Sequence, residues 1–339
     1  MRLRRSDPST PGLKRRRRGR GFRYLAPDGS PVTDPDTLER IERLVIPPAW
    51  RRVWICPHGT GHIQAVGVDD AGRRQYLYHP EWRRARDEEK HDRVLALAGR
   101  LPGVRDAIRS DLRRPHLDRL RVSAAALRMI DRGVFRSGGE EYTETNGSRG
   151  AMTLLREHVR ISGEELSFRY PAKSGLVRTL SMRDRELATV LGSLRRCRTG
   201  TSRLFAYRTA EGWRQLHADE VNERFKELAG DEFTVKDLRT WNATVLAAVA
   251  LAVREVPASQ RGRARAAAAA MKEVAEELGN TPAVARRSYV DPRVLREYES
   301  HRTIYRTVRR ADSDAVADDV LRERIEKAVI RLLRRSSRR

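Results

Sequence analysis

Hydrophobic and polar positions follow one pattern before residue 80 and another after it. In the first part, apolar and polar residues alternate in short runs, the pattern of half-buried β-strands, at 53–56, 62–68 and 74–78. A glycine-bearing turn at 69–72 joins the last two runs as a hairpin. A helical pattern at 38–45 stops before Pro47. We therefore predict a small β-rich domain over residues 21–82.

Beyond Pro80, apolar residues recur mainly at helical spacing. We expect helices near 84–100, 104–112, 117–131, 148–157, 183–196, 217–229, 234–254, 260–278 and 314–334. Residues 159–181 interrupt this series with alternating runs separated by turns, which predict a three-stranded antiparallel sheet with Lys173 at a hairpin tip. The predicted fold class is α+β, with a larger, mainly α-helical domain over residues 91–339.

The remaining segments differ in charge. Residues 1–20 contain nine basic side chains and one acidic side chain, interrupted by Pro and Gly, and predict a flexible basic arm. Arg- and Glu-rich residues 83–90 are the predicted hinge between the two domains. A C-terminal helix with a basic end is expected at 313–335.

Composition narrows the class of partner. The chain has 70 Lys and Arg against 46 Asp and Glu, a net charge of +24. Such a surplus is tolerated best when a polyanion is the usual partner, which indicates nucleic acid. No apolar run approaches the roughly eighteen residues of a membrane span, and the N-terminus lacks the apolar segment of a secretory signal. We expect a cytoplasmic protein whose two cysteines, Cys56 and Cys197, are free thiols.

Motifs for ATP and metal chemistry do not occur in the sequence. It contains neither a GxxxxGKS or GxxxxGKT phosphate loop nor HExxH. The string CPHGTGH at 56–62 holds three metal-ligand residues without a fourth at a recognisable spacing, so a strand and turn is the better interpretation. Carboxylate pairs such as Glu164-Glu165 fall at predicted turns, where solvated acids are common. We therefore predict a mechanism without metal or cofactor.

A phosphodiester can be attacked without a metal when cations neutralise the charge that develops on the phosphoryl oxygens and an acid protonates the leaving oxygen. Tyr289 is a candidate nucleophile, although a tyrosine, with a pKa of about 10, needs a strongly cationic site to react at neutral pH. Arg136, Lys173 and Arg239 are candidate cations. Taken singly, each of these residues is by default a packed or solvated side chain, so composition alone does not select them.

The order and spacing of the candidates are more specific. Arg136 is followed by the hairpin Lys173, by KDLRTW around Arg239, by GNTP, and by Tyr289 nine residues past the Asn of GNTP. This order resembles the catalytic segments of type IB DNA topoisomerases of the small poxvirus-like, bacterial branch. The resemblance extends over nearly the whole chain and includes the sequences IPPAW and RQYLY of the N-terminal region.

The resemblance implies a role for each residue. Tyr289 would form a covalent 3′-phosphotyrosine and release a 5′-hydroxyl. Arg136 and Arg239 would bind the nonbridging oxygens of the scissile phosphate, a task that suits the guanidinium fork, and Lys173 would be the general acid. Asn280 stands where the viral relatives use His. It can donate a hydrogen bond but carries no charge, so we expect a weaker contribution from it.

The resemblance also implies an activity and a partner. Positive and negative supercoils would be relaxed without ATP, because one phosphodiester is exchanged for another of similar energy. Gln75, Tyr76, Tyr78 and Tyr142 match positions that touch double-stranded DNA in the viral enzymes, although a half-buried strand aromatic is an equally good interpretation of each tyrosine. The protein would be a monomer associated with the nucleoid, and its two domains would clamp the duplex.

Two other functions remain open at this point. A tyrosine recombinase or integrase shares the catalytic constellation, but it usually has His three residues before the second Arg, where this chain has Lys236. A non-enzymatic basic nucleoid protein explains the charge equally well and leaves the order of Arg136, Lys173, Arg239 and Tyr289 as coincidence.

Overall fold

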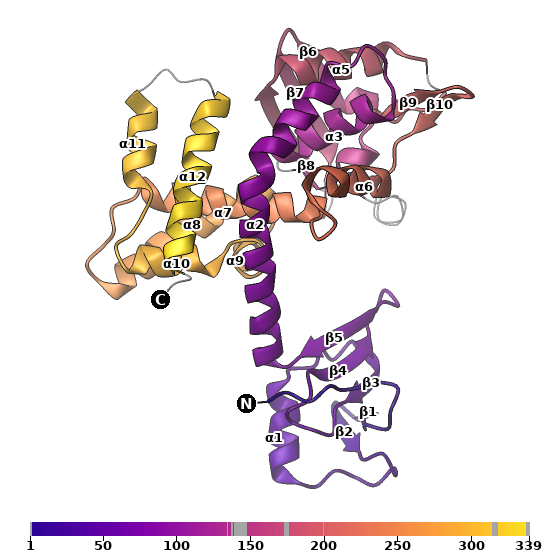
Figure 1. The fold of residues 1–339 in the computed structure, drawn as a ribbon. Helices are drawn as coiled ribbons and strands as arrows, with labels where there is room; N and C mark the ends of the chain where they lie inside the picture. Colours follow the sequence, from indigo (N-terminus) through magenta and orange to yellow (C-terminus); the bar gives the residue numbers. More distant parts are fainter. Residues whose placement is uncertain are drawn as a thin grey trace. The chain divides into compact units, whose positions relative to one another are not determined.

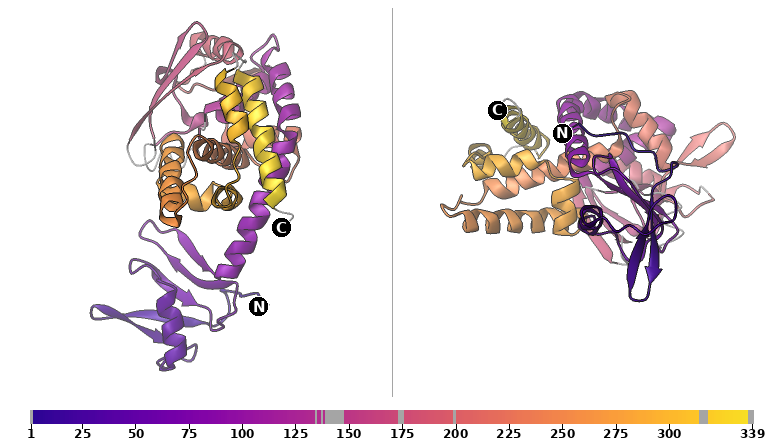
Figure 2. Two further views of the ribbon diagram at one scale, coloured as in Figure 1. Left: turned by 90° about the vertical axis from the view of Figure 1, so that its left-hand side faces the viewer. Right: turned by 90° about the horizontal axis from the view of Figure 1, so that it is seen from below.

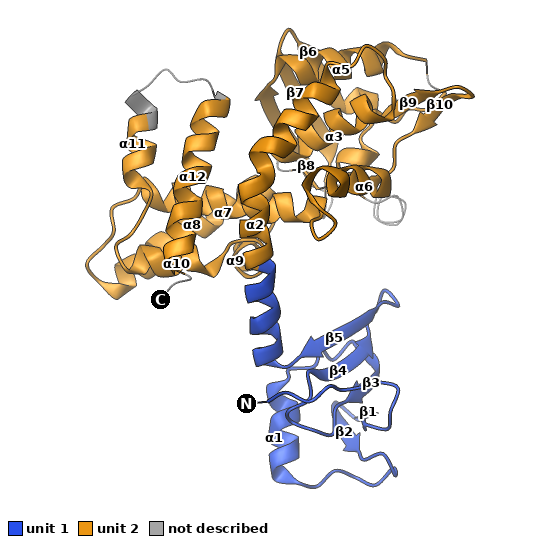
Figure 3. Ribbon diagram, viewed as in Figure 1, with its two compact units in different colours: residues 1–90 blue, residues 91–339 orange. Residues whose placement is uncertain are grey.

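The computed structural model describes residues 2–133, 135–136, 138, 148–172, 176–198, 200–313 and 318–336. The chain divides into two compact units, Met1–Lys90 and His91–Arg339 (Figure 3). The first is β-rich and the second is mainly helical with a small sheet (Figure 1). The α+β class expected from the sequence is therefore confirmed.

The first unit is built on a five-stranded antiparallel sheet in the order β2-β1-β3-β4-β5. Its strands are β1 Leu13–Arg18, β2 Gly21–Leu25, β3 Arg51–Ile55, β4 Ile63–Val68 and β5 Arg74–Tyr78. Helix α1, Pro35–Arg43, begins where the Asp34 side chain accepts a hydrogen bond from the Thr37 amide. Ile41 of α1 packs with Val53 and Ile55 of β3 in the core of this unit. The three predicted strands are thus confirmed.

Strand β1 corrects the expected basic arm at residues 1–20, because Leu13–Arg18 pairs with both β2 and β3. Leu13 is buried in the core, and the Arg15 guanidinium is held at 2.7–3.1 Å by the backbone carbonyls of Ile46, Pro47 and Trp50. The basic run concealed a strand because one of its arginines bonds inward while its neighbours are exposed.

Helix α2, Pro80–Leu112, is one continuous helix where the sequence predicted two, at 84–100 and 104–112. It passes through Pro102 because its apolar stripe continues on both sides, and packing of that stripe offsets the lost backbone hydrogen bond. The stripe consists of Val94, Leu97, Leu101, Val104, Ile108 and Leu112. Residues 83–90 are helical, and their role as a hinge stays a prediction.

The second unit is assembled around α7, which packs against α3, α6, α8, α10, α11 and α12 (Figures 1 and 2). Its long helices are α3 Arg119–Gly133, α5 Arg185–Arg196, α6 Ala218–Ala229, α7 Val235–Ala252, α8 Gln260–Leu278 and α12 Asp318–Ser336. The short helices α9 Pro282–Ser288, α10 Pro292–Glu299 and α11 Tyr305–Ser313 follow α8. Trp241 of α7 is fully buried, which places this helix in the core.

The small sheet of the second unit has the order β6-β7-β8 and is antiparallel, as predicted. Its strands are β6 Val159–Ser162, β7 Glu165–Pro171 and β8 Val177–Arg183. The helix predicted at 148–157 is wrong, since two single 3-10 turns, Ala151–Thr153 and Arg156–His158, occupy that segment. The hairpin of β9 Ala206–Thr209 and β10 Gly212–Gln215 was not predicted.

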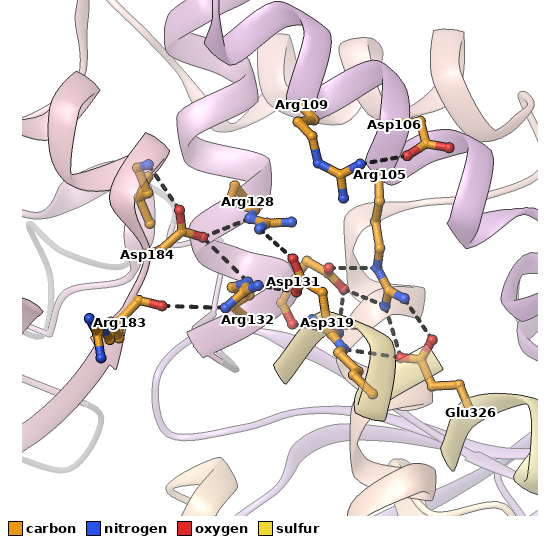
Figure 4. A network of polar contacts seen from close by, with 12 residues as sticks. Arg105, Asp106, Arg109, Arg128, Asp131, Arg132, Arg183, Asp184, Asp319 and Glu326 are labelled. Atoms are coloured by element: carbon orange, nitrogen blue, oxygen red, sulfur yellow. Dashed lines mark hydrogen bonds and ion pairs between the residues drawn. The ribbon is translucent and has the colours of Figure 1, made fainter. Parts of the chain in front are cut away.

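Helix α12 is fixed to the rest of its unit by a buried ionic network (Figure 4). Arg105 of α2 bonds Asp131 of α3 at 2.9 Å and Glu326 of α12 at 2.6 Å. Arg322 of α12 also bonds Asp131, at 2.8 Å. Burial opposes ionisation of Asp131, but the charges of Arg322 and Arg105 outweigh it and hold the pKa of this carboxyl well below its usual range.

The same network reaches α7. Asn242 donates from its side chain to the backbone carbonyl of Asp131 at 2.8 Å and accepts from Arg322 at 3.2 Å. A second branch joins Arg128 to Asp184 at 2.8 Å, and both Arg128 and Arg132 to Asp319 of α12. The C-terminal helix is therefore tied to α2, α3, α7 and the start of α5.

Two further expectations concern the whole chain. Cys56 and Cys197 are free thiols, as expected. Among the described residues, the helices are all too short or too polar to cross a membrane.

Candidate active site

Arg239 is placed by the start of α7. The Asp237 carboxylate accepts a hydrogen bond from the Thr234 amide at 2.9 Å and pairs with Arg93 of α2 at 3.0 Å. These bonds satisfy the helix start and fix it to α2. Arg239 lies on the next half-turn and is only 5% exposed, so its guanidinium is held inside the unit.

The sequence GNTP forms a sharp link between α8 and α9. Gly279 adopts the left-handed conformation, with φ 59°. The amides of Gly279 and Asn280 donate back to the carbonyls of Glu276 and Ala275, at 3.1 and 2.9 Å. This is the Schellman arrangement that commonly ends helices at Gly. Thr281 then caps α9, and Tyr289 is the residue at which α9 ends, so Asn280 and Tyr289 flank this short helix.

Three arginines take the remaining carbonyls at the end of α8. Glu277, Leu278 and Gly279 each accept a hydrogen bond from a different guanidinium: Arg178 of β8, Arg239 of α7 and Arg136, respectively. The last four carbonyls of a helix need partners outside the helix. A helix C-terminus carries partial negative charge, which stabilises a nearby cation by about 0.3–1 kcal/mol, more when it is buried. One turn thus gathers three cations from three parts of the chain.

The nucleophile candidate lies against one of these cations. The guanidinium carbon of Arg239 is 5.2 Å from the centroid of the Tyr289 ring. Burial lowers the pKa of Arg239 to about 10, and the charge of Arg136 acts in the same direction, whereas interaction with Tyr289 opposes both. A pKa near 10 still leaves Arg239 charged at neutral pH. The half-buried Tyr289 thus faces a permanent cation.

Arg136 is anchored on both sides of its Cα. Phe135 is buried against Tyr170 of β7, with ring centroids 5.8 Å apart, and the Arg136 carbonyl accepts from the Ala151 amide at 2.7 Å. Its guanidinium donates to Gly279 and also to the side-chain oxygen of Asn280. Arg136 and Asn280 are therefore coupled directly.

This contact fixes the orientation of the Asn280 amide. Because Oδ1 accepts from Arg136, Nδ2 is the group left to donate. Nδ2 is buried and has no hydrogen-bond partner within the described ranges. A cavity of about 660 Å³ lies between β8 and the end of α8 and is lined by Asn280, Arg178 and Val284, among others. An acceptor that entered here would satisfy a donor that already exists.

The structure brings together four of the five predicted catalytic residues: Arg136, Arg239, Asn280 and Tyr289. Lys173, the fifth, lies outside the described residues, as does the predicted DNA contact Tyr142. On either side of residues 173–175, the Ala172 amide donates to the Leu176 carbonyl at 2.8 Å. In the described ranges, no group of three or more His, Cys, Asp or Glu side chains is placed to hold a metal ion.

The other predicted DNA contacts lie on β5 of the first unit. Tyr76 and Tyr78 are exposed on one face and stack with ring centroids 6.0 Å apart, and Arg74 lies over the Tyr76 ring at 5.5 Å. Strand alternation directs Gln75 to the opposite face, where its amide donates to Asp69 at 3.0 Å. The two tyrosines form an exposed aromatic pair beside a cation, and Gln75 supports the adjacent turn.

A second basic surface of this unit lies on the β1–β2 hairpin. Arg16 and Arg23 stand directly opposite each other in the register. Like charges at such a position destabilise a sheet. Six exposed cations, none of which forms an ion pair within the part of the chain that the structure describes, belong to this hairpin: Lys14, Arg16, Arg17, Arg18, Arg20 and Arg23. Their repulsion is relieved when a polyanion binds.

Sequence reasoning missed Arg178 and Thr244. The register pairs Arg178 with the buried Tyr170. Leu180 and Met182 follow at alternate positions and pack on the core, so β8 places an arginine on its apolar face. This break in the apolar alternation of β8 is visible in the sequence and could have identified Arg178 as a candidate. The Thr244 hydroxyl accepts from the Asp291 amide at 3.1 Å and shares its one proton between the carbonyls of Thr240, at 2.9 Å, and Tyr289, at 3.3 Å. No sequence pattern marks this role.

Comparisons with known proteins agree on one family. The family model of the eukaryotic DNA topoisomerase I catalytic core matches residues 79–313, and that of the bacterial DNA topoisomerase IB N-terminal domain matches residues 21–69. The DNA topoisomerase 1B of Acanthamoeba polyphaga mimivirus is 30% identical over 298 residues, which cover 86% of this chain and 88% of the viral protein. The DNA topoisomerase 1B of vaccinia virus, strain Copenhagen, is 25% identical over 236 residues, 68% of this chain and 70% of its own.

Proposed function

The chain belongs to the type IB DNA topoisomerase family, and on this premise we propose that it relaxes positive and negative supercoils by transesterification, without ATP or metal. The observation that carries the proposal is the gathering of Arg136, Arg239 and Asn280 at one helix end, with Arg239 over the ring of Tyr289. Fixed cations beside a phenol are what attack on a phosphodiester needs.

In the cleavage step, the Tyr289 oxygen forms a bond to phosphorus as the bond from phosphorus to the 5′ oxygen breaks. The phenol proton passes to solvent, and Lys173 supplies a proton to the leaving 5′ oxygen. Arg136 and Arg239 stabilise the negative charge on the nonbridging oxygens, and Asn280 donates to one of them from Nδ2. Religation reverses every bond change.

The energetics remove any need for a cofactor. The protein-bound 3′ phosphodiester has about the same energy as the DNA phosphodiester that it replaces, so the strand reseals without ATP. While the 5′ end is free, torsional strain drives rotation about the intact strand. Relaxation of either sign of supercoil follows from the same step.

Duplex binding involves both units. In the first unit, DNA is contacted by the stacked Tyr76 and Tyr78, by Gln75 of the same strand, and by the cations of the β1–β2 hairpin. In the second, Tyr142 contacts DNA near the cleavage site. The enzyme clamps the duplex as a monomer associated with the nucleoid.

The test is relaxation of a supercoiled plasmid in EDTA without ATP, together with adduct formation on a nicked suicide duplex in a denaturing gel. Wild-type protein should relax the plasmid and form the adduct, and Tyr289→Phe should do neither. Tyr305→Phe, at an exposed tyrosine of α11, is the matched control and should behave as wild type. A recombinase would require paired sites, and a nucleoid protein would bind without an adduct. An adduct that persists in Tyr289→Phe would refute the assigned nucleophile.

A further inference from the structure

The arginines at the end of α8 include one with no role in the proposed chemistry. Two carbonyls of the last turn, those of Ala275 and Glu276, are satisfied by the Schellman bonds. The next three, 277–279, which we call the carbonyl turn, are taken by Arg178, Arg239 and Arg136. Arg178 therefore completes a set whose other two members are candidate phosphate ligands.

The position of Arg178 is costly for a purely structural residue. It occupies the inward face of β8, in register with the buried Tyr170, where the strand pattern otherwise places Leu180 and Met182. Burial lowers the pKa of Arg178, since it disfavours the charged form, and the charge of Arg136 adds to this effect. An apolar side chain at this point would continue the core without that cost.

Gly279 of the carbonyl turn lies beside this guanidinium. A Cβ atom added at Gly279 would lie 2.9 Å from Nη1 of Arg178, in addition to the strain of φ +59° on an L-residue. Gly279 thus leaves room for Arg178 and at the same time orients Asn280, the next residue. Strand β8 is joined here to the turn that carries the Arg136 and Arg239 contacts.

We propose that Arg178 is a positioning residue for strand cleavage: by holding the Glu277 carbonyl, it fixes the carbonyl turn on which Arg136, Arg239 and Asn280 are oriented. This inference rests on the proposed function. Arg178 does not itself contact the scissile phosphate. Its loss lets the turn shift, and a shift of about 1 Å in groups that stabilise a transition state can cost about a hundredfold in rate.

The experiment measures single-turnover cleavage of a suicide duplex at saturating enzyme by Arg178→Ala, Arg178→Lys and the control Arg183→Ala. Arg183 lies on the same strand but on the opposite, exposed face, where its side chain pairs with Glu164. DNA affinity is measured separately with each substitution added to Tyr289→Phe, and thermal unfolding is recorded for every variant.

Arg178→Ala should slow cleavage by about 10- to 100-fold, with the Kd within about threefold of the parent. Arg178→Lys keeps a cation with one donor for Glu277 and should recover most of the rate. On a duplex with a neutral methylphosphonate at the scissile position, the difference between wild type and Arg178→Ala should shrink, because the misplaced arginines then have less charge to stabilise. A defect in folding alone would be the same on both substrates.

Four results would overturn the inference: cleavage by Arg178→Ala at the wild-type rate, a defect confined to Kd, an equal defect on both substrates, or the same loss in Arg183→Ala. If Arg178→Ala does not fold, Arg178→Gln takes its place under the same criteria. Failure of the proposed function is distinguishable, because wild-type protein would then form no adduct at all.

Discussion

The guanidinium carbon of Arg239 lies 5.2 Å from the centroid of the Tyr289 ring, so the candidate nucleophile is in place against a buried cation without DNA. The Arg239 guanidinium donates a hydrogen bond to the Leu278 carbonyl, and the backbone carbonyl of Tyr289 accepts one from the Thr244 hydroxyl. Both residues are therefore positioned by bonds that DNA does not have to create, which lowers the ordering cost of reaching the reactive geometry.

Thr244 is the first test of this arrangement. Thr244→Val keeps the shape of the side chain but removes the hydroxyl that accepts from the Asp291 amide and whose proton the Tyr289 carbonyl shares with that of Thr240. An unsatisfied buried amide costs about 1–3 kcal/mol, so we expect a lower Tm and a single-turnover cleavage rate reduced by about tenfold. Thr244→Ser retains the hydroxyl and should remain close to wild type. Equal cleavage rates for the Val and Ser variants would show that the Tyr289 backbone needs no such support.

Asn280 provides the second test. Its Nδ2 is a buried donor without a partner among the described residues. A hydrogen bond to a charged acceptor contributes about 1.5–3 kcal/mol, so Asn280→Ala should slow cleavage by at least about tenfold. Asn280→Asp removes the donor and places an acceptor in its position, so it should be slower still. Cleavage by Asn280→Asp at the rate of wild type would mean that Nδ2 does not act on the phosphate.

The third test concerns the β1–β2 hairpin. Changing Arg16, Arg18 and Arg23 together to Gln should weaken DNA binding and reduce the slope of log K against log salt by about 0.9 for each phosphate that these arginines neutralise. The cleavage rate at saturating DNA should not change. Changing Arg43, Arg113 and Arg183, whose side chains are exposed and form surface ion pairs, to Gln gives a variant of equal charge outside the hairpin. If that variant shows the same reduction in slope, net charge rather than the hairpin surface controls binding.

The sequence predicted most of the fold because its periodicities were uninterrupted. Leu166, Phe168 and Tyr170 alternate along β7, and helices such as α8 show both helical spacing and a Gly at their end. The prediction failed where a residue type that indicates one local structure lies in tertiary packing that favours another. Pro102 indicates a helix end, although apolar packing continues through it, and Arg15 belongs to a run that indicates a solvated arm, although it bonds three carbonyls inside the unit.

The candidate site was predicted by residue order, whereas its physical basis became visible only in three dimensions. Nothing in the local sequence of Arg136 or Arg239 indicates that both bond neighbouring carbonyls at the end of α8. Such bonds join segments far apart in the chain, which periodicity does not report. Arg178 could have been noticed as a cation on the apolar face of β8, but its partner at Glu277 could not. The role of Lys173 stays a prediction.

The last prediction concerns the ionic network under α12 and its dependence on pH. The folded state holds the pKa of Asp131 below the ordinary value of 3.8, so the unfolded chain binds more protons than the native protein as the pH falls below that value. This carboxylate therefore stabilises the fold fully above about pH 4, and its contribution declines as the pH falls further. Arg105 and Arg322 share two carboxylates, Asp131 and Glu326. Asp131→Asn leaves both guanidinium groups on Glu326 alone and should destabilise the protein by about 3 kcal/mol at pH 7, while the difference from wild type narrows below pH 4. Urea unfolding of both proteins at pH 7, 5 and 3 measures this difference in the free energy of unfolding.

Asp106→Asn, in the exposed pair with Arg109 (Figure 4), is the control, and its stability should differ little from that of wild type at any pH. A constant difference between wild type and Asp131→Asn from pH 7 to 3 would contradict the assignment, because it would mean that the charge of Asp131 is not what holds the network together.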